Sequence, residues 1–279
     1  MSIVPEWNRQ ALLQSPLFEP LHGLLALAAG SRMPSLDDLN SLVAQYKGQI
    51  AVQSGKPVCF VEPARGGSAS FETQYEPRCY LTGEVQTRRD NWHDLFNALV
   101  WMVFPRAKAA INARHCQALS NTQSVTGRRG SERDMLTLFD ESGVIVVHAD
   151  DDLAGLLGAF QWKELFWQRR NQLNAAMGFH LFGHGLYEKA LRPYVGMTGQ
   201  GLILKVERDF FCWSLADRLT CLDGLLADYL LAKGNCSSTR ELNPVPLLGV
   251  PGWSAENDRA AYYDNVHYFR KMRRAATAT

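Results

Sequence analysis

Hydrophobic and polar positions separate most sharply between Asn91 and His115. Projected on a helix at about 100° per residue, one narrow arc collects mostly polar residues: Asp90, His93, Asp94, Asn97, Trp101, Lys108, Asn112 and His115. The opposite side is almost wholly apolar: Leu95, Phe96, Leu99, Val100, Met102, Val103, Ala107 and Ala110. A helix this apolar is expected deep in the domain, so its polar arc must find internal partners or line a cavity. The pattern indicates the place of a site without naming a reaction.

Pro105 interrupts this stretch. A proline inside a helix removes a hydrogen bond and clashes one turn back, whereas a proline at the first helical position is well tolerated. Either one kinked helix carries the whole arc, or one helix ends at Phe104 and Pro105 opens a second. The run Phe-Pro-Arg-Ala-Lys-Ala-Ala favours the break, which would place two short polar faces at a corner.

Other stretches predict the elements around this pair. Capping signals or helical periodicity mark 35–46, 161–174, 186–191 and 214–231, with Ser35 as an N-cap. Short β-type runs mark 58–61, 144–147 and 202–206, while 74–88 is predicted to be extended and 120–130 a polar loop. Residues 140–143 are typical of the loop that closes a β-hairpin.

We therefore predict a single α+β domain over residues 1–279, helix-rich, with a small antiparallel sheet. An irregular N-terminal arm is expected at 1–33 and an extended C-terminal wrap at 240–279. The length is ample for one large core, and no repeat or change in composition demands a second domain.

Composition narrows the class of protein. Hydrophobic residues make up 46% of the chain and charged residues 20%, and the formal net charge of +1 argues against a general polyanion binder. The apolar runs are shorter than the roughly 20 residues that span a bilayer, and the first residues lack a signal-peptide pattern. Six cysteines without a Cys-x-x-Cys pair favour free thiols in a reducing compartment. We expect a cytoplasmic protein, with membranes and nucleic acids disfavoured as partners.

The polar arc supplies candidate chemistry. His93, Asp94, Asn97, Lys108 and His115 combine imidazoles, a carboxylate, an amide and an amine. Such groups suit acid–base catalysis or the binding of zinc or iron, and a buried lysine can be tuned toward neutral pKa. The alternative is that they hydrogen-bond to loop backbone and only hold the fold, because buried ionisable clusters are not always functional sites.

His184 and Glu188 are four residues apart and would share one face of a helix. The spacing permits two-point metal binding or a histidine base oriented by glutamate, although a simple His–Glu pair in a short helix is the commoner arrangement. Together with the arc it gives a candidate set for a divalent transition metal, formed by His93, His115 and His184.

Three further charged groups have simpler interpretations. Asp140 and Glu141 could be paired catalytic carboxylates, but before Ser142-Gly143 they are more typical of a turn. The aspartates at 150–152 stand where an N-cap and a first helical turn belong. The loop 127–130, with paired arginines, could bind an anion, yet a solvated surface role is the more common one.

Several long motifs resemble a known family. They are Asn91-Trp-His-Asp-Leu-Phe-Asn-Ala-Leu-Val-Trp101, Phe104-Pro-Arg-Ala-Lys108, Asn112-Ala-Arg-His115, Thr137-Leu-Phe-Asp-Glu141, Gly183-His184, Tyr187-Glu-Lys-Ala-Leu191 and Leu248-Gly-Val-Pro-Gly-Trp253. Over roughly residues 58–270 the chain is similar to a bacterial family catalogued as a domain of unknown function, number 3025. The resemblance implies one family-defined unit in a bacterial, cytoplasmic setting, and it brings no activity.

Two functions remain open at this point. The preferred hypothesis is a hydrolase of a small-molecule substrate, using acid–base or metal-assisted chemistry at His93, Asp94, Asn97, Lys108, His115, His184 and Glu188. No dinucleotide fingerprint or nucleophile elbow points to another reaction class. The alternative is a non-catalytic binding or assembly protein whose polar cluster is structural. Convergence of the three histidines in space would favour the first.

Overall fold

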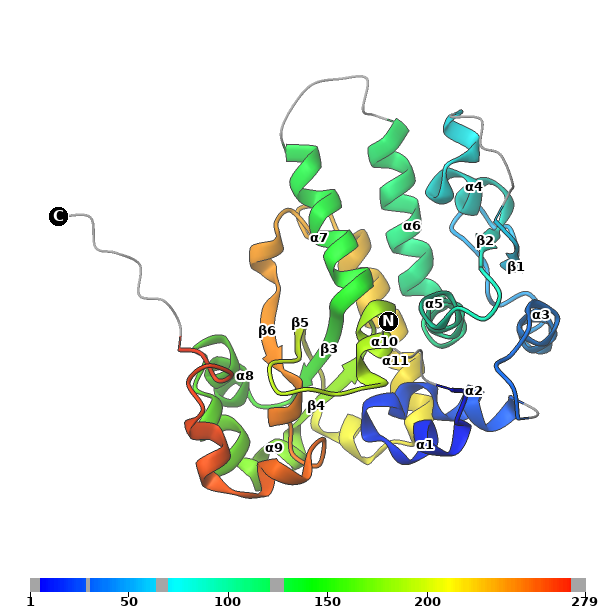
Figure 1. Ribbon diagram of the computed structural model, residues 1–279. Coiled ribbons are helices and arrows are strands. Elements are labelled where there is room, and N and C mark those ends of the chain that lie inside the picture. The colour runs from blue at the N-terminus through cyan, green and yellow to red at the C-terminus, as the bar shows by residue number, and fades with distance from the viewer. Residues whose placement is uncertain (1–5, 29–30, 64–69, 121–127, 272–279) are drawn as a thin grey trace.

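The computed structural model describes residues 6–28, 31–63, 70–120 and 128–271, with side chains from residue 130 onward in the last segment (Figure 1). The helices of the first half are α1 (Arg9–Gln14), η1 (Pro16–Leu21), α2 (His22–Leu27), α3 (Leu36–Gln45), η2 (Phe71–Thr73), α4 (Tyr75–Thr82), α5 (Trp92–Val103) and α6 (Pro105–Ser120). Those of the second half are α7 (Arg128–Ser142), α8 (Asp151–Gly158), the π-helical η3 (Glu164–Gln168), α9 (Arg170–Ala176), α10 (His184–Ala190), η4 (Arg208–Cys212), α11 (Leu215–Leu231) and the short turns η5 (Thr239–Glu241), η6 (Leu247–Gly249), η7 (Ala255–Asp258) and η8 (Ala260–Asp264).

The corner between α5 and α6 lies in the core. Every residue of α5 from Leu95 to Met102 is buried. The predicted break is confirmed, because α5 ends at Val103 and Pro105 opens α6. Asp223 of α11 caps the new helix by accepting hydrogen bonds from the backbone N–H groups of Arg106 and Ala107, at 3.1 and 2.9 Å. The cap satisfies two donors that a helix start otherwise leaves unpaired.

A four-stranded sheet with the order β4-β3-β5-β6 lies beside these helices. The central strand β3 (Gly143–His148) is buried along its whole length and pairs antiparallel with β4 (Met177–Leu181) and parallel with β5 (Thr198–Lys205). The edge strand β6 (Asn243–Pro246) is antiparallel to β5, and a separate parallel pair joins β1 (Cys59–Val61) to β2 (Glu84–Gln86). The helix-rich α+β class is confirmed. The sheets are mixed and parallel, not purely antiparallel, because helical crossovers connect the parallel strands.

Figure 1 shows α6 and α7 standing side by side, with α10 near the base of α7. α11 packs along α6, and α10 packs against both α5 and α7. The segment 240–279 was predicted to be extended, but after β6 the chain follows the short turns η6, η7 and η8 beside α8 and α9; residues 272–279 lie outside the described part.

Three local predictions were wrong. Segment 74–88 was predicted to be extended, which holds for β2 but not for α4. Pro77 falls in the first turn of α4, where proline is tolerated, and Gly83 ends the helix with a φ of 79°. Residues 140–143 form no hairpin, because α7 runs through Ser142 directly into β3. The N-terminal arm, predicted to be irregular up to a short helix at its end, is helical in α1 and η1 as well as in the terminal α2.

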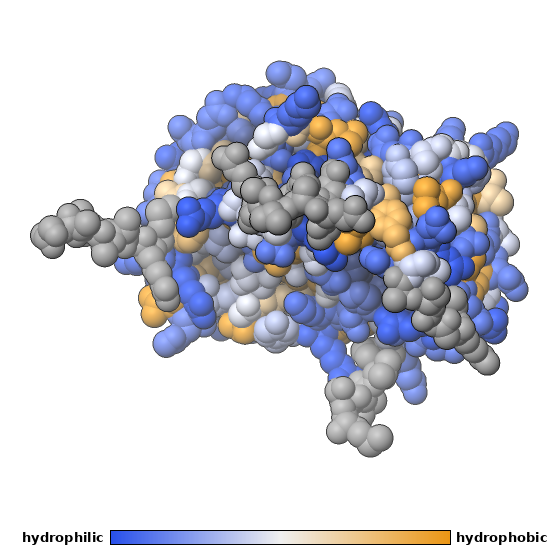
Figure 2. Space-filling model, turned by 90° about the horizontal axis from the view of Figure 1, so that it is seen from above, coloured by the Kyte–Doolittle hydropathy of each residue, from blue (hydrophilic) through white to orange (hydrophobic). Residues whose placement is uncertain are grey.

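Other local signals are confirmed. Ser35 caps α3 in a capping box with Asp38, and Asp150 caps α8. Figure 2 shows mostly hydrophilic residues on the upper face, with hydrophobic residues in small groups. Among the described residues, none of the helices combines the length and apolarity needed to cross a membrane.

Candidate metal centre

The first turn of α5 fixes two polar side chains at the edge of the core. Asn91 caps the helix by accepting from the N–H of Asp94 at 3.0 Å, so His93 and Asp94 lie in the opening turn. Arg88 grips the Asp94 carboxylate with two side-chain hydrogen bonds of 2.8 and 2.9 Å and one from its own backbone N–H at 2.7 Å. Burial alone would raise the pKa of Asp94, but these bonds hold it below its ordinary value.

Two glycines bring α10 against the end of α7. A Cβ at Gly183 would collide with the backbone of Glu141, Ser142 and Gly143, and a Cβ at Gly185 would collide with the Glu141 carboxylate. Because both positions lack a side chain, His184 between them starts its helix directly beside Glu141. His184 is only 6% exposed, so its side chain is buried among its neighbours.

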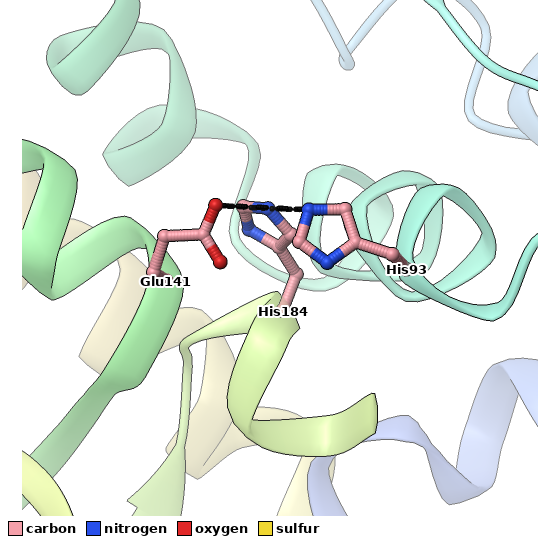
Figure 3. Close-up of side chains that lie close together, drawn as sticks. All are labelled: His93, Glu141 and His184. Atoms are coloured by element: carbon pink, nitrogen blue, oxygen red, sulfur yellow. Dashed lines mark hydrogen bonds and ion pairs between the residues drawn. The ribbon is translucent and has the colours of Figure 1, made fainter. Parts of the chain in front are cut away.

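His93, Glu141 and His184 bring one ligand atom each to a common point from α5, α7 and α10 (Figure 3). Nε2 of His93 lies 3.1 Å from Nε2 of His184. Oε1 of Glu141 lies 3.6 Å from the first of these nitrogens and 3.4 Å from the second. Ligands bound tetrahedrally about 2.0–2.1 Å from zinc are about 3.3–3.4 Å apart. The three atoms, which we call the trio, therefore have the dimensions of one face of a zinc coordination sphere.

A carboxylate lies behind each histidine of the trio. Nδ1 of His93 is 3.1 Å from Oε2 of Glu188, and Nδ1 of His184 is 3.7 Å from Oδ2 of Asp140. When Nδ1 of His93 donates to Glu188, its Nε2 presents a lone pair to the centre of the trio. A carboxylate hydrogen-bonded in this position orients a metal-binding imidazole and raises its basicity, and Glu188 has this place behind His93. Nδ1 of His184 has no hydrogen-bond partner among the described residues, so Asp140 acts on it only through its charge.

Lys108 secures the Asp140 carboxylate. Its ammonium, on a residue only 4% exposed, lies 2.5 Å from Oδ1 of Asp140. Burial would raise the pKa of Asp140, but the attraction of Lys108 and His184 outweighs it and lowers that pKa. A hydrogen bond with His184 likewise lowers the pKa of Glu141. Both carboxylates are therefore ionised at neutral pH.

The trio opens on a cavity of about 260 Å³. Its wall comes from α4, β2, α5, α6, α7 and α10 and consists of Tyr75, Glu76, Gln86, Arg88, His93, Asp94, Asn97, His115, Thr137, Asp140, Glu141 and His184. Nδ2 of Asn97 donates to the Tyr75 hydroxyl at 2.9 Å. Burial lowers the pKa of His115 to about 4, so this ring is neutral at pH 7.

The seven residues predicted from the sequence gather around this cavity. Five of them line it, namely His93, Asp94, Asn97, His115 and His184. The other two, Lys108 and Glu188, contact Asp140 and His93. The predicted metal set differs in one member, since His115 lies on the cavity wall and Glu141 takes the third place in the trio.

Sequence reasoning missed Glu141, Asp140, Tyr75 and Glu76. The first two were interpreted as turn formers, and α4 was predicted to be extended. One signal was present: Thr137, Asp140 and Glu141 have the i, i+3, i+4 spacing of a single helix face, which a helical interpretation of 128–142 would have used. The Arg128 and Arg129 side chains proposed for an anion lie outside the described part.

Comparison with known proteins places the whole trio inside one family-defined region. No curated protein and no solved structure matches the chain. The model of one family, described as "Protein of unknown function (DUF3025)", matches residues 58–273, which include every residue of the cavity wall. The chain therefore belongs to this family.

Proposed function

We propose that this protein is a metal-dependent hydrolase whose metal is bound by His93, Glu141 and His184. The observation that supports it is the size of the trio, with ligand-atom separations of 3.1, 3.4 and 3.6 Å. Two imidazoles and one carboxylate suit Zn²⁺, since Mg²⁺ and Ca²⁺ prefer oxygen ligands throughout. Three protein ligands are also the usual complement of a catalytic zinc, which keeps its fourth position for water or substrate.

Hydrolysis is the reaction that these groups serve. A bound Zn²⁺ lowers the pKa of water and polarises a carbonyl. In the overall reaction the water oxygen forms a bond to the carbonyl carbon, the bond to the leaving group breaks, and the leaving group takes up a proton. The protein supplies orientation through Glu188, which is hydrogen-bonded behind His93, and hydrogen-bonding groups at Tyr75 and Asn97 on the wall.

Metal binding is tested first. Purified protein is stripped with a chelator, titrated with Zn²⁺ and examined by elemental analysis. We expect one Zn²⁺ per chain and a higher melting temperature with zinc. His93→Ala and His184→Ala should abolish both, while His267→Ala, at an exposed histidine away from the trio, should change neither. Absence of bound metal together with an unchanged melting temperature on chelation would end the proposal.

Catalysis is tested separately, with a panel of amide, ester and phosphoester substrates. A hydrolase loses activity in His184→Ala while the metal-free variant remains folded. If His184→Ala costs only folding stability and every substrate class stays uncleaved by the zinc-loaded protein, the cluster is structural and the protein is a binding or assembly protein.

We further infer a bacterial cytoplasmic setting. All six cysteines are free, which suits a reducing compartment. Fractionation of the source cells, with the protein recovered outside the soluble cytoplasmic fraction, would contradict this.

A further inference from the structure

The acidic groups around the cavity differ in how their charge is balanced. Asp94 is paired with Arg88, and Asp140 with Lys108. Glu141 belongs to the trio and Glu188 faces His93. Glu76 is different, because within the described part of the chain no lysine, arginine or histidine lies within ion-pair distance of it.

Glu76 is held in place by an amide. Nδ2 of Asn112, a residue only 2% exposed, donates to Oε2 of Glu76 at 2.6 Å and to its backbone oxygen at 2.9 Å. The bond orients the carboxylate on the cavity wall without neutralising it. Burial raises the pKa of Glu76 to about 7, although the Asn112 hydrogen bond and the charges of Lys108 and Arg133, which lie beyond ion-pair distance, act to lower it.

One acceptor on the same wall has no hydrogen-bond partner among the described residues. Asn97 is 7% exposed and lines the cavity, and its Oδ1 has no hydrogen-bond partner among the described residues. Buried amide oxygens are nearly always bonded to something, so an unsatisfied one beside a cavity indicates a missing donor. The Tyr75 hydroxyl, from the same wall, accepts a hydrogen bond from Nδ2 of Asn97, not from its Oδ1.

Among the described residues, the cavity wall offers less to an anion than to a cation. Arg88 is the only lysine or arginine on the described cavity wall, and the Nε–Nη2 edge of its guanidinium is bound to the Asp94 carboxylate, whose charge balances its own. The remaining polar lining away from the trio is neutral, namely Gln86, Thr137 and the uncharged ring of His115. A carboxylate or phosphate on the substrate would therefore meet unpaired Glu76 and be repelled.

We propose that the cavity binds substrates that carry a protonated amine, with the ammonium group held by Glu76 and the Oδ1 of Asn97. The inference rests on the proposed function for the reaction and names the substrate class of the same site: a small amide or ester that bears an ammonium group. The cavity of about 260 Å³ accepts only a compact group, since pockets for drug-sized ligands measure about 300–1,000 Å³.

The experiment uses n-butylammonium as the probe, with butyrate and 1-butanol as probes of equal chain length. Binding to the full chain is followed by ligand-observed NMR at about pH 8, so that Glu76 is ionised. It is measured on metal-free and zinc-loaded protein. We expect n-butylammonium to bind both forms and to bind more tightly than either other probe.

Variants assign the binding to Glu76. Glu76→Gln should weaken n-butylammonium binding roughly 10- to 100-fold, as loss of a charge-assisted hydrogen bond does. Glu72→Gln, which neutralises an exposed acid four residues away, should leave it unchanged. If Glu76→Gln fails to fold, Asn97→Leu serves instead and should also weaken the ammonium probe.

The outcomes separate this inference from the metal proposal. Butyrate binding as tightly as n-butylammonium, no binding of the ammonium to either form, or equal affinity in the wild type and a folded Glu76→Gln would each overturn it. Ammonium binding to a chain that takes up no zinc would leave this site standing while the metal proposal fails. Zinc uptake without ammonium binding would do the reverse.

Discussion

Replacement of Gly185 by alanine should separate folding from metal binding. Gly185 is the second residue of α10 and is not among the glycines with positive φ, so alanine can adopt its backbone conformation. In a helix that exchange alone stabilises by about 0.5–1 kcal/mol. The new Cβ, however, would collide with Oε2 of Glu141, the residue that completes the trio.

The size of the effect follows from the geometry. Relief of the collision requires the Glu141 carboxylate to move by about 1 Å, to ordinary contact distance. Metal–ligand distances tolerate only about 0.2 Å, so the displaced oxygen no longer binds with the two histidines. Loss of a supporting residue behind a ligand lowers metal affinity about 10- to 100-fold, which corresponds to about 1.4–2.7 kcal/mol. Loss of the ligand itself should lower the affinity by at least as much.

Two measurements test Gly185→Ala. Zinc affinity is obtained by competition with a chromophoric chelator, and the unfolding free energy of the metal-free protein by urea denaturation. Gly155→Ala in α8 is the matched control, because its Cβ would meet no atom within 4 Å. Equal zinc affinities of Gly185→Ala and Gly155→Ala would refute the argument. It would also be refuted if metal-free Gly185→Ala were destabilised by more than about 2 kcal/mol, since the substitution would then act through folding.

Three further predictions concern the surroundings of the trio. Glu188→Gln should weaken zinc binding about 10-fold, which is the lower end of the usual range because the Glu188 side chain is 48% exposed. Unchanged zinc affinity in chelator competition would show that Glu188 does not support the site. Lys108→Met should lower the unfolding free energy by about 3–5 kcal/mol, because it leaves the Asp140 charge buried and unpaired. The double variant Lys108→Met/Asp140→Leu should lose far less unfolding free energy. Equal losses for the two variants in urea denaturation would contradict this. Burial and the Arg218 charge lower the pKa of His180 to about 3 in the native state. Below about pH 6.5 the ring is therefore protonated in the unfolded chain but stays neutral in the native state, and the unfolding free energy falls as the pH falls. His180→Leu should gain about 2 kcal/mol on the wild type between about pH 7.5 and pH 5, measured on metal-free protein, and a difference that does not grow as the pH falls would contradict this.

The sequence predicted where polar side chains gather around the cavity, because burial and polarity conflict within α5 and α6. Polar residues on buried helices must have internal partners. Asn97 bonds to Tyr75, Lys108 to Asp140, and Asn112 to Glu76. The break at Pro105 was predictable for the same kind of reason, since φ restriction and the missing N–H act locally.

The partners themselves were not predictable, because they depend on contacts between distant segments. Asp140 and Glu141 are followed by Ser142-Gly143, which by local preference suggests a turn. Gly143 instead lets α7 pass straight into β3, since a Cβ there would collide with the carbonyl of Phe139. That single local error removed Glu141 from the predicted metal set and left His115 in its place. The propensity of four residues was overridden by the packing of a buried strand.

The apolar residues that the pattern marked as core also explain why the trio is pre-organised. Phe96 lies one turn after His93 and Tyr187 one turn after His184, and their rings stack with centroids 5.6 Å apart. Phe139 and Phe182, each two residues before a trio member, stack at 5.0 Å and join α7 to the start of α10. Because all four rings are fully buried, the relative placement of the three helices is set by close packing and not by the polar groups. The three atoms of the trio are thus brought together by the packing of the core, which is the arrangement that the proposed metal centre requires of rigid elements.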